Sequence, residues 1–196
     1  ALIVSGGHTQ LVLFHGHGDF RLLGHTQDDA VGEAFDKVAK IIGLPYPGGP
    51  SIAAAAPSGD AHASRLPIAR LQNPYDFSFS GLKTAVLRLA QSITGVDHTF
   101  PSHQLAERLS KQQQVDITAS FQYTAVRTLV RATQRAYRDY QPASVVIAGG
   151  VAANTELRQQ LRQAIDAPIE YAPMQLCTDN AAMVAALAYY RSQQQQ

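Results

Sequence analysis

The stretch Ser144-Val145-Val146-Ile147-Ala148-Gly149-Gly150-Val151-Ala152-Ala153-Asn154 decides the fold class. Its β-branched first half predicts a strand over 144–148, and the two glycines predict a tight turn. Asn154 is a preferred helix N-cap and predicts a helix to about residue 165. A strand over 169–172 and a closing helix over 180–190 follow in the same alternation. This half of the chain is therefore typical of an α/β fold.

The first half predicts an antiparallel meander of three short strands, at 2–4, 9–14 and 20–23. An amphipathic helix is expected over 30–42, with its start capped by Asp28-Asp29. Residues 45–50, with three prolines and two glycines, predict a rigid loop before a short Ala-rich helix at 51–56. A helical insertion is expected at about 57–114, including a helix at 82–91, and then a long helix over 116–140. We expect one lobe over 1–192 and a disordered tail at 193–196.

Composition limits the partners. The chain has 196 residues and a formal charge of +1 from 16 Lys+Arg and 15 Asp+Glu, so any contact with nucleic acid must be local or shared. Its single cysteine excludes an internal disulfide and a Cys-rich zinc site. No apolar run reaches the ~20 residues that span a bilayer. We expect a cytoplasmic protein with no membrane partner.

Two glycine turns are candidate ligand loops. Gly6-Gly7 joins two strands, where backbone N–H groups can approach an anion, although an ordinary hairpin turn explains the pattern as well. Gly149-Gly150 stands between a strand and the helix that begins at Asn154, a favoured ligand position, but it lacks the full dinucleotide fingerprint. Each loop alone leaves both interpretations open.

Three polar residues are further candidates. Asp36 lies off the apolar face of its helix, where it can reach a ligand hydroxyl or form a solvated pair with Lys37. Lys83 follows two aromatic residues and suits a phosphate or RNA contact. Asp179 suits a helix cap or one ligand of a metal whose other donors come from elsewhere. No HExxH motif is present, which disfavours a self-contained metalloprotease.

The wording and order of these segments resemble the bacterial-type tRNA threonylcarbamoyladenosine transferase family, also described as glycoprotease-like or sialoglycoprotein endopeptidase-like. The similarity covers nearly the whole chain. It is carried by Val4-Ser5-Gly6-Gly7-His8-Thr9-Gln10-Leu11, Asp28-Asp29-Ala30-Val31-Gly32-Glu33-Ala34-Phe35-Asp36-Lys37, Pro47-Gly48-Gly49-Pro50, Asp76-Phe77-Ser78-Phe79-Ser80-Gly81-Leu82-Lys83-Thr84, Ala148-Gly149-Gly150-Val151-Ala152-Ala153-Asn154 and Cys177-Thr178-Asp179-Asn180.

The resemblance implies the actin, Hsp70 and sugar-kinase fold, of which this chain is expected to be the second lobe, with the first lobe absent. Asp179 matches a metal ligand, and the resemblance implies one divalent ion, iron in preference to zinc, whose two histidine ligands lie upstream of Ala1. The positions that match those holding the adenylate are Ile3, Val4, Ser5, Gly6, Gly7, Asp36, Gly49 and Asn154.

The implied reaction transfers the threonylcarbamoyl group from threonylcarbamoyl-AMP to the amino group of the tRNA adenosine 3′ of the anticodon. No general base is assigned. The resemblance also implies a paralogous subunit of the same fold, a small ATPase and the adenylate-forming enzyme as partners, besides tRNA. Two alternatives stay open: an ATP-binding kinase or ATPase of the same fold, and an inactive scaffold fragment.

Overall fold

The fold is built on a five-stranded mixed sheet, seen in a computed structural model that describes residues 1–177 and 180–193. The strand order is β3-β2-β1-β4-β5. Strands β1 (Leu2–Val4), β2 (Thr9–Gly16) and β3 (Asp19–His25) form the antiparallel meander. Strands β4 (Val145–Ala148) and β5 (Ile169–Tyr171) extend the sheet in parallel from β1. The predicted α/β class and the order of its elements are confirmed.

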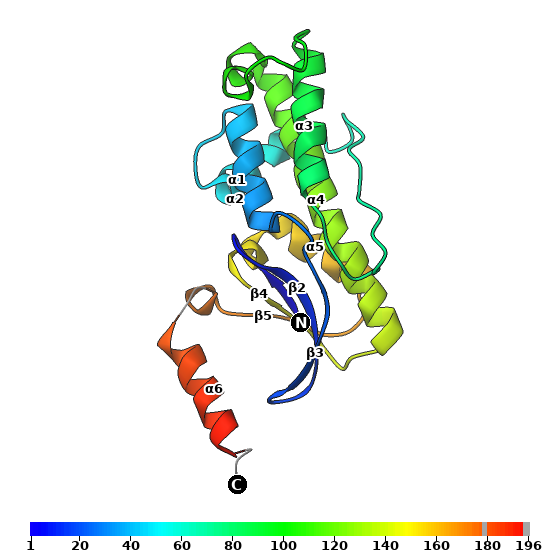
Figure 1. Cartoon of the computed structure of the whole chain (residues 1–196), viewed down its shortest axis with the longest axis vertical. Coiled ribbons are helices and arrows are strands. Elements are labelled where there is room, and N and C mark those ends of the chain that lie inside the picture. Colours follow the sequence, from blue (N-terminus) through cyan, green and yellow to red (C-terminus); the bar gives the residue numbers. More distant parts are fainter. Residues whose placement is uncertain (178–179, 194–196) are drawn as a thin grey trace.

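The helices gather mainly on one side of this sheet (Figure 1). Helix α1 is Val31–Ile42, α2 is Gly48–Ala55, α3 is Ser80–Ile93, α4 is Lys111–Tyr140, α5 is Thr155–Ala164 and α6 is Ala181–Gln193. Short 3₁₀ turns lie at Ala56–Ser58, Ser102–Gln104, Ala106–Arg108, Gly150–Ala153 and Met174–Leu176. No helix in the described part of the chain is both long and apolar enough to cross a membrane.

The core forms where alternate strand residues meet these helices. Leu2, Val4 and Ile147 are fully buried, whereas Val146 on the opposite face of the sheet is 37% exposed. Phe35 of α1 packs edge to face on Phe121 of α4, with ring centroids 5.0 Å apart. The apolar spacing that predicted α1 buries one face of that helix, whereas α4 is buried around most of its circumference, because other helices pack around it. Helix α6 stands apart from this core in Figure 1, and none of its described side chains is buried.

The expected cap of α1 is wrong. The N-cap residue is Ala30, whose side chain makes no capping hydrogen bond. Asp28 instead turns toward the segment before α3, where its carboxylate accepts hydrogen bonds from the Ser78 and Ser80 hydroxyls and from the Phe79 N–H, at 2.5, 2.7 and 2.8 Å. Asp28 bonds these distant groups and does not cap α1, because its one carboxylate can then accept hydrogen bonds from several donors at once.

Other boundaries differ by a few residues. Helix α2 begins at Gly48, inside the segment predicted as a loop, because proline is tolerated in the first turn of a helix, where Pro50 lies. Helix α4 begins five residues earlier than expected, since Ser110 and Gln113 form a capping box. Within the segment 57–114, the buried side chains of Leu82 and Val86 join α3 to the core. Gln193 ends α6, and the rest of the expected tail lies outside the described residues.

Replacing Asp28 by Asn should destabilise the fold by about 1–3 kcal/mol, because it removes a charged acceptor of several hydrogen bonds. Burial of the Asp28 carboxyl opposes ionisation, but the bonds from Ser78, Phe79 and Ser80 outweigh it and lower its pKa. This stabilisation is therefore fully present above the unfolded pKa of about 3.9 and is lost as the pH falls through the lower folded pKa.

The measurement is urea unfolding as a function of pH, with Asp166→Asn as the matched control at an exposed loop position. An Asp28→Asn variant as stable as the wild type at neutral pH would contradict this account of the turn before α3.

Candidate ligand site at the carboxyl ends of β1 and β4

The candidate site lies where two parallel strands end side by side. Leu2 of β1 pairs with Ile147 of β4, and Ile3 pairs with Ala148, so the loops after both strands leave the same edge of the sheet. A Cβ on Gly149 would lie 2.2 Å from the Val4 carbonyl oxygen, which shows how closely the two chains pass. Loops at the carboxyl ends of parallel strands are favoured ligand positions in α/β sheets. The two glycine turns singled out in the sequence are thus brought together.

The loop after β1 is held by its own serine. The Ser5 hydroxyl oxygen accepts hydrogen bonds from the N–H groups of Gly7 and His8, at 3.3 and 3.0 Å. The Ser5 N–H donates to the His8 carbonyl at 2.8 Å. The N–H groups of Gly7 and His8, which could otherwise bind an anion, therefore already stabilise the turn. What the loop presents to a ligand is chiefly an exposed backbone with no side chain at Gly6 or Gly7.

Helix α1 begins directly against this loop. The Gly32 N–H donates to the Ser5 carbonyl at 3.1 Å, and the Val31 N–H donates to the hydroxyl of the fully buried Thr9 at 2.9 Å. A Cβ at Gly32 would lie 2.7 Å from the Ser5 oxygen, so only glycine allows this approach. Sequence reasoning missed Thr9 and Gly32 as residues that position the site. One indication of their importance was present in the sequence: both lie within the segments that resemble the family.

Asp36 lies one turn further along α1 and holds the first residue of α2. Its carboxylate accepts a hydrogen bond from the Gly48 N–H at 2.7 Å. A Cβ at Gly48 would lie 2.6 Å from the Asp36 Cα, so α1 and the start of α2 are in close contact. This bond positions Gly49, the next residue, beside α1. The alternative role of Asp36, a solvated pair with Lys37, is not formed, because Lys37 bonds Asp29 and Glu33 at 2.6 and 2.9 Å.

Asn154 is buried, and its side chain has two structural partners. Its amide oxygen accepts from the Leu157 N–H at 3.0 Å, which is the N-cap of α5 that the sequence predicts. Its amide nitrogen donates to the Gln122 side-chain oxygen of α4 at 2.9 Å. The capping interpretation is therefore confirmed. Gln122, which sequence reasoning did not single out, fixes the amide orientation of Asn154.

The glycines of the site fall into two groups. A Cβ at Gly32, Gly48 or Gly149 would overlap backbone atoms, so these glycines are required by the fold itself. A Cβ at Gly6, Gly7, Gly49 or Gly150 meets nothing within 4 Å. Space in front of a glycine that the fold does not need is typical of a position where a ligand approaches the backbone closely.

The remaining predicted residues are placed as follows. Val4 is fully buried toward the helices, whereas Ile3, its neighbour in β1, points to the opposite face and lines a cavity of about 660 Å³. Lys83 lies in the first turn of α3, partly exposed. Asp179 lies outside the described residues. Among residues 1–177 and 180–193, no three His, Cys, Asp or Glu side chains gather as a metal site.

The fold and the glycine-lined sheet edge define the class: a lobe of the actin-like ATPase fold. The chain is similar in structure to HypF of T. kodakarensis, with a TM-score of 0.54 and 13% identity over 80% of this chain and 18% of that one. It is also similar to the activator of the 2-hydroxyisocaproyl-CoA dehydratase from Clostridium difficile, with a TM-score of 0.50 and 17% identity over 98% of this chain and 60% of that one. At these identities the likeness concerns the fold alone.

Sequence relatives identify the family. The family model TsaD, tRNA N6-adenosine threonylcarbamoyltransferase, matches residues 1–186. Curated proteins of that name from Thermomicrobium roseum and Symbiobacterium thermophilum are 49% and 50% identical over 98% and 96% of this chain. The chain belongs to the TsaD family. It spans about half the length of these relatives, 54% and 52% respectively.

Substitution by alanine should destabilise the protein at the glycines that the fold requires and leave its stability nearly unchanged at the open glycines. Gly149→Ala should cost at least about 2 kcal/mol, because φ is +96° there and the new Cβ would meet the Val4 carbonyl. Gly6→Ala should change the free energy of unfolding by less than about 0.5 kcal/mol, since its Cβ meets open space. Thermal or urea unfolding of the two variants tests this. Equal losses would show that the open glycines are required by the fold.

Proposed function

We propose that this chain provides the adenylate-binding lobe of an enzyme that transfers the threonylcarbamoyl group from threonylcarbamoyl-AMP to the amino group of the tRNA adenosine 3′ of the anticodon. The observation that carries this proposal is the combination of TsaD family membership with open space before Gly6, Gly7 and Gly150 at the sheet edge and before Gly49 of α2. The family gives the reaction class, and the open glycines give a place where an adenylate can lie against the backbone.

In this reaction the adenosine amino nitrogen attacks the carbamoyl carbonyl carbon. The bond from that carbon to the phosphate oxygen breaks, AMP leaves, and the amino group loses a proton. The proposed contribution of this chain is to bind and orient the adenylate between the loop 5–7 and the loop 149–154. Asp36 holds Gly48, the neighbour of Gly49, beside α1, and Gln122 holds Asn154. The roles of Ile3, Val4, Ser5, Gly6, Gly7, Asp36, Gly49 and Asn154 in binding are part of this proposal.

A divalent metal belongs to the same proposal, with iron preferred over zinc and Asp179 as one ligand. The described residues do not by themselves assemble a metal site. The other ligands are proposed to come from outside this chain. We also propose the cytoplasm as the compartment, and as partners tRNA, a paralogous subunit of the same fold, a small ATPase and the adenylate-forming enzyme.

Transfer of labelled threonine to tRNA, with adenylate supplied to the whole protein and its partners, tests the proposal. Gly7→Ala should lower transfer at least about tenfold, because the added methyl group occupies the space in which the ligand approaches. Gly16→Ala is the matched control, since a Cβ there also meets nothing within 4 Å but lies in the hairpin away from the site.

If the Gly7→Ala variant transferred threonine as fast as the wild type, the loop that contains Gly7 would not be part of the adenylate site. A wild-type protein that hydrolyses ATP or phosphorylates a substrate, but transfers no threonylcarbamoyl group, would favour the kinase or ATPase alternative. Absence of every one of these activities would favour the scaffold alternative.

A further inference from the structure

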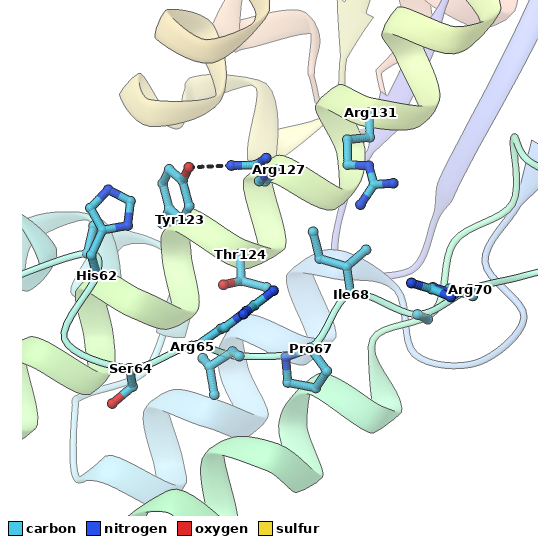
Figure 2. A pocket seen from close by; sticks show the side chains of 13 residues that line it. His62, Ser64, Arg65, Pro67, Ile68, Arg70, Tyr123, Thr124, Arg127 and Arg131 are labelled. Atoms are coloured by element: carbon cyan, nitrogen blue, oxygen red, sulfur yellow. Dashed lines mark hydrogen bonds between the residues drawn. The ribbon is translucent and has the colours of Figure 1, made fainter.

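A groove rich in arginine lies on the side of α4, away from the candidate ligand site. Arg127 and Arg131 form one wall on α4, while Arg65 and Arg70 lie on the segment 61–70 that runs alongside (Figure 2). We call this the arginine groove; its cavity measures about 610 Å³. None of its lining residues is among those proposed to bind the adenylate. It therefore needs a separate explanation.

The charged side chains that line the groove are all basic. Four arginines and His62 line it, and no aspartate or glutamate does. All four arginines are exposed. In the part of the chain that the structure describes, the ion pairs involve only Lys37 and Arg135, so these four guanidinium groups have no carboxylate within 4.0 Å. The whole chain carries only +1, so this concentration of positive charge is local.

The α4 wall is a regular stripe. Tyr123, Arg127 and Arg131 are spaced four residues apart and so lie on one face of the helix. Like charges at this spacing destabilise a helix by a few tenths of a kcal/mol, and an anion bound between them removes the repulsion. The Tyr123 hydroxyl accepts a hydrogen bond from the Arg127 guanidinium at 2.6 Å, which holds this arginine in place.

The opposite wall is tied down although it has no regular secondary structure over 65–71. The Asp60 N–H donates to the Asp116 carboxylate at 2.9 Å, and the Ser64 N–H donates to the Ser120 hydroxyl at 3.2 Å. Both acceptors belong to α4. The backbone that carries Arg65 is therefore fixed against the same helix that carries Arg127. An ordered segment without helix or strand that presents charged side chains is typical of a functional loop.

The basic surface continues beyond the groove. A second cavity of about 510 Å³ shares Arg70 and Arg131 with it and adds Arg135 and Arg138. Its one lining carboxylate, Asp76, already accepts hydrogen bonds from His25, Gln27 and Asn73. Arg135 is neutralised by Asp139 at 2.7 Å. Arg138 follows Arg127 by eleven positions, or about 17 Å at the helical rise of ~1.5 Å per residue. This length is greater than one small anion needs and suits a chain of phosphates.

We propose that the arginine groove binds the phosphodiester backbone of the tRNA substrate. Guanidinium groups bind phosphate oxygens in bidentate fashion, and contacts of this kind position a nucleic acid without reading its sequence. Gln122, which holds Asn154 at 2.9 Å, directly precedes Tyr123, so one rigid helix joins the groove to the candidate ligand site. This inference rests on the proposed transferase function, for which it supplies the surface that holds the RNA.

The test is the binding of fluorescently labelled tRNA to the whole protein with its partners, at several salt concentrations. The variant Arg127→Gln/Arg131→Gln should bind at least about tenfold more weakly at ~0.1 M salt, and the slope of log K against log salt should become shallower by about 1.4–2. The control Lys40→Gln/Lys111→Gln removes the same charge at exposed positions elsewhere and should bind like the wild type.

Wild-type affinity and salt slope in the arginine variant would overturn the proposal. So would an equal loss in the lysine control, because net charge alone would then explain it. Loss of a protein partner with tRNA affinity intact would assign the groove to an acidic protein surface instead. In transfer assays the arginine variant should raise KM for tRNA and keep kcat. A wild-type protein that binds tRNA through the groove but transfers nothing would refute the proposed reaction and leave the groove standing.

Discussion

The attachment of α1 to the first turn of the sheet is the constraint on which the site depends. The N-cap residue of α1, Ala30, makes no side-chain capping bond, so the first N–H groups of the helix need partners from elsewhere in the chain. The Thr9 hydroxyl and the Ser5 carbonyl provide them. These bonds fix the start of the helix against the loop after β1, and the buried face that includes Phe35 then packs on α4. Asp36 can hold Gly48 only because this start is fixed.

The parallel pairing of β1 with β4 is the second constraint. It places Gly149 against the Val4 carbonyl and directs the following turn to the same edge as Gly6 and Gly7. Asn154 then caps α5 and is itself held by Gln122. The two candidate loops are therefore each held by a helix, α1 for the loop after β1 and α4 for the loop after β4, and such support is the rigidity that the proposed adenylate site needs.

The arginine groove gives a nearly neutral chain one strongly positive surface. Its positive charge is gathered on one face of α4 and on the tied segment beside it, while acidic residues elsewhere balance the total. Asp28 and Asp36, for example, are occupied in holding neighbouring segments. Local separation of charge thus allows RNA attraction at one surface without a field over the whole molecule.

The sequence by itself determined the fold class, the order of its strands and helices, and the family. These follow from local patterns: β-branched runs, apolar residues at helical spacing, glycine turns and the Asn154 cap, all of which act between near neighbours in the chain. The candidate loops were also predictable, because glycines between regular elements stand out at once.

Only the tertiary structure decided which partners these residues take. Asp28 serves the turn before α3 and not α1, and Gln122 reaches across to Asn154. Arg65 and Arg127 are 62 positions apart yet line one groove. Such contacts join segments that are distant in the chain. The capacity of one residue to form a hydrogen bond or an ion pair does not indicate which distant residue will be its partner. Packing the helices on the sheet is what brings them together.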